Sequence, residues 1–107
     1  MKTDKILSYL GLAAASRSVA CGTELVLTEV RRGKKDICVL MSSDVSERTE
    51  KQLTDKCAYY RVPLVKLPCD MYELGARTGK KHPVAAVAVT NPSLVRQILT
   101  YSANNEA

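Results

Sequence analysis

The chain has 107 residues, enough for one compact domain and too few for a second hydrophobic core. Hydrophobic residues make up 46% and charged residues 25%, the mixture expected of a soluble globular domain, and no apolar run approaches the roughly 20 residues that a membrane-spanning helix needs. The net charge of +5 favours partners that carry phosphate, such as nucleic acid. Ser8, Tyr9 and Ser16 interrupt the apolar residues near the N-terminus, so we expect no secretory signal and a cytoplasmic protein.

The first third of the chain predicts two helices around a short strand. Thr3 or Asp4 is expected to cap a first helix whose apolar residues recur on one face. The apolar residues 19–21 are expected to form an edge strand. Thr23 is expected to cap a second helix, which stops at Gly33, a residue type suited to a left-handed C-terminal turn.

The middle of the chain predicts a buried strand, a helix and another strand. Residues 37–41 form a continuous apolar run, which is typical of a strand covered on both faces. Ser46 is expected to cap a third helix, and this helix must end before Pro63, because the proline ring disfavours a helical residue ahead of it. Residues 64–67 are expected to form the next strand.

The last third predicts a short helix, a buried strand and a final helix. Asp70 followed by Glu73 resembles a capping box, residues 84–89 are expected to form a strand, and Asn91 before Pro92 is expected to begin the last helix. From about Ser102 a flexible tail is expected. The alternation predicts one α/β domain over residues 1–107, with a mixed sheet of about four strands between layers of helices.

Four cysteines are widely spaced and form no Cys-x-x-Cys pair, and His82 is the single histidine. Because zinc sites usually draw on closely spaced pairs, Cys21, Cys38, Cys57 and Cys69 are expected to be reduced, mostly buried thiols. A catalytic cysteine needs a partner base, for which the sequence offers little choice. We therefore expect no catalytic residue, no metal ion, no cofactor and no enzymatic activity.

The first candidate binding site is the start of the second predicted helix, at Gly22, Thr23 and Glu24. Free N–H groups at a helix start attract phosphate and can reach base edges, and the glycine lets an RNA backbone come close. A cationic run at the far end of the same helix can hold a flanking phosphate strand: Arg31, Arg32, Lys34 and Lys35. The alternative is an ordinary capped helix whose basic end complements its dipole.

The second candidate site is a basic segment that begins at Gly75-Ala76 and continues through Arg77, Thr78, Gly79, Lys80, Lys81 and His82. It is superficially similar to an NTP-binding P-loop. However, the glycine spacing is too short, Lys81 stands where Ser or Thr is required, and a helix rather than a strand is predicted before it. We interpret the segment as a flexible basic loop for an RNA backbone, the alternative being a solvated connection.

In their order and spacing, the segments from Ile6 to about Val89 resemble the ribosomal protein L7Ae family, which includes kink-turn RNA-binding proteins, and its small bacterial members most of all. The resemblance implies a three-layer α/β/α sandwich. The features that carry it are Gly22-Thr23, Arg32-Gly33, Met41-Ser42-Ser43-Asp44, Leu53 to Cys57, Val62-Pro63, Leu74-Gly75 with Gly79, and Val87-Ala88-Val89.

The resemblance also implies how RNA is held. In the family, the turn before the second helix and that helix's first two turns read tandem sheared G·A pairs in a kinked RNA, while the loop ahead of the last strand covers an extruded nucleotide. By position, the second site corresponds to residues 77–82. The first corresponds to Gly22, Thr23, Glu24, Leu25 and Thr28.

This chain departs from the family pattern at both places. Kink-turn binders typically have Asn-Glu and, one turn later, Lys, where this chain has Glu24, Leu25 and Thr28. The covering loop has residues 80–82, Lys-Lys-His, in place of an apolar-acidic-apolar trio. Since good bidentate base contacts are worth about 1–3 kcal/mol each in discrimination, we expect RNA binding of weaker or different specificity.

The sequence thus predicts a protein that binds rRNA or another kinked RNA in a translation or ribosome-related role. One alternative is a protein-interaction module that docks on a ribosomal or RNA-maturation factor. Another is a non-catalytic recognition unit beside an RNA-modifying enzyme. The RNA-binding hypothesis requires residues 22–35 and 75–82 to converge into a single electropositive face.

Overall fold

The computed structural model describes the backbone of residues 2–33 and 35–106 and the side chains of residues 4–33 and 35–102. None of the described helices combines the length and apolarity needed to cross a bilayer. In chain order the elements are α1 (Lys2–Ala15), β1 (Val19–Cys21), α2 (Thr23–Arg31), β2 (Cys38–Met41), α3 (Glu47–Tyr60), β3 (Leu64–Lys66), α4 (Met71–Arg77), β4 (Ala86–Val89) and α5 (Pro92–Glu106).

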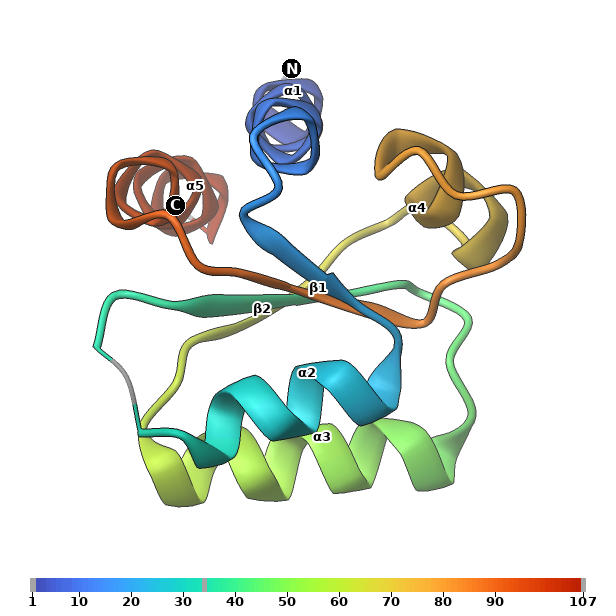
Figure 1. Ribbon diagram of the computed structural model, residues 1–107, viewed down its shortest axis with the longest axis vertical. Coiled ribbons are helices and arrows are strands. Elements are labelled where there is room, and N and C mark those ends of the chain that lie inside the picture. The colour runs from blue at the N-terminus through green and yellow to red at the C-terminus, as the bar shows by residue number, and fades with distance from the viewer. Residues whose placement is uncertain (1, 34, 107) are drawn as a thin grey trace.

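The elements form three layers, in which one mixed sheet lies between two layers of helices, as predicted. The strand order is β1-β4-β2-β3; β2 and β3 are parallel, and the other two pairings are antiparallel. Helices α1, α4 and α5 cover one face of the sheet, and α2 and α3 lie side by side on the other (Figure 1). The α/β/α sandwich and the position of β1 at the edge of the sheet are therefore confirmed.

The two central strands are apolar on both faces, which explains the continuous run seen in the sequence. In β2, Cys38 and Leu40 belong to the core on the α1 and α5 side, whereas Val39 and Met41 belong to the core on the α2 and α3 side. All four side chains are buried. The same alternation occurs in β4, where the residues that point to α2 and α3 are the small Ala86 and Ala88.

Capping side chains determine where three of the helices begin. Ser46 accepts a hydrogen bond from the amide of Thr49, and Asp70 accepts one from the amide of Glu73 at 2.8 Å. Asn91 accepts from the amide of Ser93 at 3.0 Å. These bonds satisfy amides that have no partner inside their helices, and the three predicted caps are confirmed.

One predicted helix start is wrong, and one helix is longer than its anchoring residues indicate. Thr23 does not cap α2, because Gly22 occupies the cap position and Thr23 is already helical. Helix α5 extends to Glu106, beyond Leu99, the last residue that the sequence pattern anchors in it, whereas the flexibility expected from about Ser102 stays a prediction. No glycine or proline follows Ser102 to stop the helix, and the ring of Tyr101 packs on that of Tyr9 in α1, with ring centroids 5.8 Å apart.

Candidate nucleic-acid interface

The start of β4 joins the two segments that follow β1 and β2. The amide of Gly22 donates to the carbonyl of Ala86 at 2.9 Å, and the amide of Ser42 donates to the carbonyl of Ala85 at 3.0 Å. The turn between β1 and α2, the loop after β2 and the beginning of β4 therefore lie at one end of the sheet (Figure 1).

The short helix α4 is tied to the same end of the sheet. The amide of Val84 donates to the carbonyl of Met71 at 2.9 Å, and the amide of Met71 donates to Oδ1 of Asp44 at 3.0 Å. Both predicted binding segments thus lie at the same end of the sheet, although they are far apart in the sequence and α2 and α4 cover opposite faces. We call this surface the α2–α4 edge and define it as residues 22–28 and 77–83.

Helix α2 begins at this edge with its positive end open. Gly22 has φ 95° and ψ 150°, a conformation that L side chains rarely adopt, and it provides no side chain to cap the helix. The first amide that reaches a helical carbonyl is that of Val26, which donates to Gly22 at 2.9 Å. Within the described part of the chain, the amides of residues 23–25 have no acceptor, so they remain available to an anion.

The side chains beyond these amides are exposed and mostly uncharged. Glu24, Leu25 and Thr28 are exposed, Leu25 with 57% of its surface. The hydroxyl of Thr28 donates to the carbonyl of Glu24 at 3.0 Å, so this donor is already used. The first turns of α2 therefore offer one carboxylate, one apolar side chain and the free amides.

The loop after α4 packs directly on that helix. At Gly75 a side chain has no space, because a Cβ atom would collide with the backbone carbonyl of His82. The amide of Lys80 donates to the carbonyl of Gly75 at 2.9 Å. The sequence had indicated a flexible glycine-rich loop; in the structure Gly75 instead holds the loop against α4.

One predicted binding residue of this loop is not accessible. Only 6% of Thr78 is exposed, and its hydroxyl donates to the carbonyls of Leu74 and Gly75 at 3.0 and 2.9 Å. The prediction that Thr78 contacts RNA is therefore wrong, since its side chain closes the end of α4. Gly79 follows with φ 77° and turns the loop outward.

The cations of the loop are exposed and unpaired, whereas the nearby acids are engaged. Residues 80–82 are all exposed, and no ion pair forms to them among the described residues. Arg77 forms an ion pair with Glu73, with its guanidinium nitrogen 3.4 Å from the carboxylate oxygen. Asp44 and Asp70 accept hydrogen bonds from backbone amides. Lys80 and Lys81 are thus the cations of the α2–α4 edge available to phosphate.

The second cationic run lies at the other end of α2, so the two cationic runs form separate clusters, and their convergence into a single electropositive face stays a prediction. Nine helical residues, with a rise of about 1.5 Å each, separate the two ends by about 13 Å. Figure 1 shows this end of α2 away from α4. Arg31 and Lys35 are exposed there, and Arg32 pairs with Glu29 at 3.6 Å. Lys34 lies outside the described residues.

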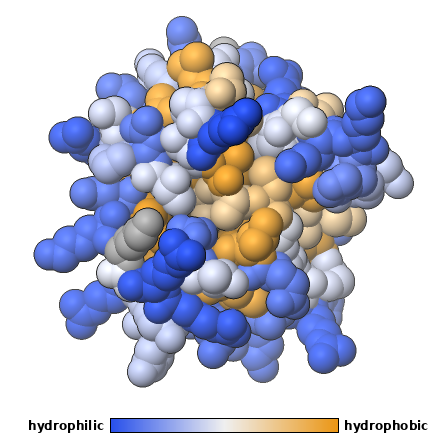
Figure 2. All heavy atoms as spheres, in the orientation of Figure 1, coloured by the Kyte–Doolittle hydropathy of each residue, from blue (hydrophilic) through white to orange (hydrophobic). Residues whose placement is uncertain are grey.

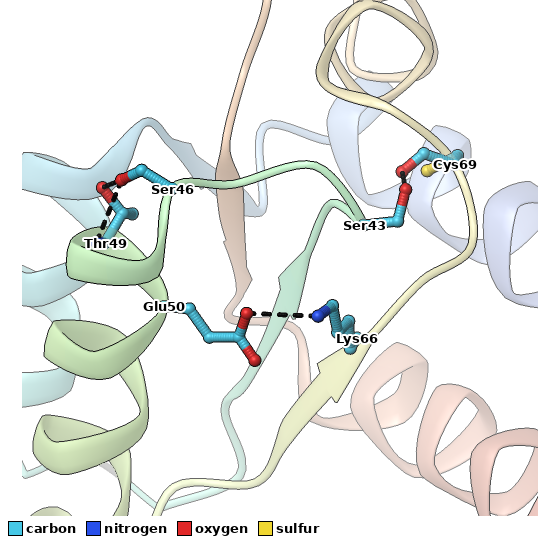
Figure 3. A network of polar contacts seen from close by, with 6 residues as sticks. All are labelled: Ser43, Ser46, Thr49, Glu50, Lys66 and Cys69. Atoms are coloured by element: carbon cyan, nitrogen blue, oxygen red, sulfur yellow. Dashed lines mark hydrogen bonds and ion pairs between the residues drawn. The ribbon is translucent and has the colours of Figure 1, made fainter.

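The loop between β2 and α3, and the start of α3 itself, are held to the segment that contains β3 and the residues after it (Figure 3). Ser43 donates to the carbonyl of Cys69 at 3.1 Å, and Lys66 of β3 pairs with Glu50 of α3, also at 3.1 Å. The preceding Ser42 is fully buried, and its hydroxyl has no partner among the described residues. These positioning contacts could not be predicted from the sequence, because their partners are distant in sequence.

Apolar surface borders the start of α2. Figure 2 shows hydrophobic residues in the middle of the face that carries β1, with hydrophilic residues around them. The residues of β1 are half-buried, and Leu12 and Leu25 are each 57% exposed. Of these side chains, Leu25 belongs to the first turn of α2 and adds apolar surface there.

The cysteines do not form a reactive site. Cys38, Cys57 and Cys69 are buried, Cys21 is half-buried, and all four are free thiols. Burial raises the pKa of Cys38 to about 12 and that of Cys57 to about 11, so these thiols are protonated at neutral pH and are poor nucleophiles. Within the described residues, no three His, Cys, Asp or Glu side chains cluster as metal ligands do.

Comparison with known proteins agrees with this architecture. Two bacterial relatives are both called RNA-binding protein YlxQ. The one from Bacillus subtilis is 38% identical over 91 residues, 85% of this chain and 88% of the relative. The one from Enterococcus faecium is 36% identical over 83 residues, 78% and 79% of the two chains.

Two solved structures have the same fold. A protein of unknown function from Bacillus halodurans superposes with a TM-score of 0.82 at 33% identity, over 92% of this chain and 97% of that one. The 15.5kD RNA binding protein of Giardia lamblia superposes with a TM-score of 0.81 at 19% identity, over 98% and 88%. The model of the ribosomal protein L7Ae/L30e/S12e/Gadd45 family matches residues 4–98, so the resemblance seen in the sequence is confirmed and the chain belongs to this family.

Proposed function

We propose that the protein binds structured RNA through the α2–α4 edge and performs no reaction on it. The observation that supports the proposal is that the unpartnered α2 amides and the unpaired Lys80 and Lys81 belong to segments that are both joined to the start of β4. The bond from Gly22 to Ala86 joins the start of α2, and the bond from Val84 to Met71 joins α4. Amides at a helix start and exposed cations both bind phosphate. The names of the two bacterial relatives support the proposal.

The proposed ligand is a kinked RNA, with rRNA as the first class to examine, in a translation or ribosome-related role in the cytoplasm. The amides of residues 23–25 would donate to phosphate or to base edges in a widened groove. Glu24 is exposed and would accept from an exocyclic amine of guanine or cytosine. Lys80, Lys81 and His82 would lie along the backbone of the unpaired strand.

The exposed residues of α2 predict a specificity different from that of a standard kink-turn reader. Leu25 cannot accept a hydrogen bond from a guanine edge, and the single donor of Thr28 is used within the helix. Each lost base contact removes about 1–3 kcal/mol of discrimination. The 57% exposed Leu25 would instead contact a ribose or the apolar part of a base.

Arg31, Arg32 and Lys35 are proposed as a secondary contact to a phosphate strand that flanks the kink. Their distance from the start of α2, about 13 Å for nine residues, is less than the width of an RNA helix. Their contribution should be smaller, because Arg32 is partly neutralised by Glu29 and because cations at a helix C-terminus already complement its dipole.

The exposed apolar surface around β1 favours a second candidate function, a protein-interaction module that docks on a ribosomal or RNA-maturation factor. Leu12 is 57% exposed, and among the described strands β1 pairs with β4 alone, which leaves its other edge without a strand partner. Binding to such a factor that persists at high salt, without any protected RNA, would favour this function.

The experiment that tests RNA binding is a titration at several salt concentrations. The probe is a hairpin RNA with a three-nucleotide bulge next to tandem G·A pairs, and the control RNA is fully paired. We expect tighter binding to the bulged RNA and an affinity that falls linearly with salt on logarithmic axes. Binding no tighter than that of a neutral control protein, with no salt dependence, would contradict the proposal.

A further inference from the structure

Tyr72 is an aromatic residue of α4 that the proposed contacts do not use. Its side chain is 70% exposed, which is unusual for a large ring that gains free energy from burial. Tyr59 of α3 is similarly exposed, at 79%, but its ring packs on Tyr60 in a T-shaped pair at 4.9 Å. Among the described residues Tyr72 has no such ring partner, so its faces are open to a ligand.

The backbone contacts of the preceding residue hold Tyr72 at the α2–α4 edge. Met71 donates to Asp44 in the loop after β2, and its carbonyl accepts from Val84 at the end of the basic loop. Tyr72 therefore directly follows the point at which α4 is joined to the start of β4. The two hydrogen bonds of Met71 therefore hold the backbone at Tyr72, and the side chain of Tyr72 is not needed for this.

The face of α4 that carries Tyr72 borders the basic loop. Residues three apart on a helix lie on neighbouring positions of one side, and Gly75 is three residues after Tyr72. The backbone of His82 occupies the space where a side chain of Gly75 would be. The ring of Tyr72 is therefore one helical turn from the loop that carries Lys80 and Lys81.

We propose that Tyr72 forms a base-stacking subsite for an unpaired nucleotide of the bound RNA, while Lys80 and Lys81 contact the phosphates beside that nucleotide. An exposed ring next to unpaired cations has the two elements that bind single-stranded nucleic acid, because every base has a face to stack and every nucleotide a phosphate. The inference rests on the proposed RNA-binding function and adds to it the side chain on which an unpaired base stacks.

The test uses the full chain and the bulged hairpin RNA with 2-aminopurine in the bulge, whose fluorescence is quenched when it stacks. We expect wild type to quench the probe, and Tyr72→Ala to abolish quenching and weaken binding about 5- to 150-fold, as expected for the loss of one stacked base. Tyr72→Phe should retain both properties. Tyr59→Ala, which removes an equally exposed tyrosine of another helix, should behave as wild type.

The controls separate this inference from the function on which it rests. Because Tyr72 carries no charge, its replacement should leave the salt dependence unchanged, and the affinity for fully paired RNA should not change either. If wild type binds the bulged RNA but Tyr72→Ala binds and quenches equally well, the stacking subsite is wrong and RNA binding stands. If wild type binds neither RNA, both proposals are wrong.

Discussion

The two ends of helix α2 both carry cations, but their surroundings differ. At its C-terminal end, Arg31 and Arg32 belong to the helix itself or to its cap, and Arg32 pairs with Glu29. Cations at this end complement the negative pole of the helix and need no ligand to explain them. At its N-terminal end, the cations belong to a loop more than 50 residues further along the chain, at Lys80 and Lys81, and this loop leads into the same end of the sheet from which α2 begins.

The difference shows that local charge is a poor guide to a binding surface. Placing cations near the positive pole of α2 does not stabilise the helix, and it is favourable only if an anion lies between them. The C-terminal cluster, although richer in cations, has an adequate structural explanation. We therefore expect changes at the α2–α4 edge to affect RNA binding more than equal changes at the other end.

The largest effect is expected where the edge depends on close packing. Gly75→Ala forces the backbone of His82 away from α4, and this overpacking should cost about 1–3 kcal/mol of stability and displace Lys80 and Lys81 from the edge. Urea unfolding measures the first effect and RNA titration the second. The matched control is Gly11→Ala in α1, where a Cβ meets nothing within 4 Å; it should gain about 0.5–1 kcal/mol. Equal stabilities of the two variants would contradict the packing account.

The second-largest effect is on the salt dependence of RNA binding, and it compares the cationic clusters at the two ends of α2. Lys80→Ala with Lys81→Ala removes two unpaired charges, so the slope of log affinity against log salt should become shallower by about 1.8. All RNAs should be affected about equally, since phosphate contacts carry no sequence information. Arg31→Ala with Lys35→Ala removes the same charge at the other end of α2 and should change the slope less. The opposite order of the two double variants would show that the main contact is at the C-terminal end.

A smaller effect should follow from adding a cation to the first turns of α2. Thr28 is exposed beside Glu24, and Thr28→Lys should strengthen binding to the RNA with tandem G·A pairs about fivefold, which corresponds to roughly 1 kcal/mol for one added base contact. The control is the fully paired RNA, for which little gain is expected. If both RNAs gain equally, the new lysine acts only through phosphate, and base reading by this helix face is not supported.

The smallest effect concerns Cys21, the residue before Gly22. Cys21 is half-buried at the end of β1, whereas Cys38 and Cys57 are buried with raised pKa values. At pH 8, iodoacetamide should therefore modify Cys21 and leave the other two unmodified, and bound RNA should slow the reaction of Cys21. Mass spectrometry of the alkylated peptides measures both. A rate at Cys21 that saturating RNA leaves unchanged would argue against a contact at the β1–α2 turn.

Features that depend on nearby residues were predictable from the sequence. The caps at Ser46, Asp70 and Asn91 lie within three residues of the amides that they satisfy, so composition and position indicate them. The buried central strand β2 was predictable from its unbroken apolar run. The order of the segments also indicated the family, and with it the three-layer fold.

Features that depend on residues distant in the sequence were not predictable from it. The join between Gly22 and Ala86 requires β1 to pair with β4, a neighbour that periodicity cannot identify. Thr78 has the exposed character of a loop residue in the sequence, but its hydroxyl closes α4. Gly75 is flexible by type, yet here the lack of a side chain allows the loop to pack tightly. Each of these roles is set by tertiary contacts.

The most direct measurement is the mapping of amide chemical shifts of nitrogen-15-labelled protein as the bulged hairpin RNA is added. The largest changes should occur at the amides of Thr23, Glu24 and Leu25, which have no acceptor among the described residues, and at residues 80–82. Changes concentrated at Arg31, Arg32 and Lys35, with residues 23–25 and 80–82 unaffected, would contradict RNA binding at the α2–α4 edge.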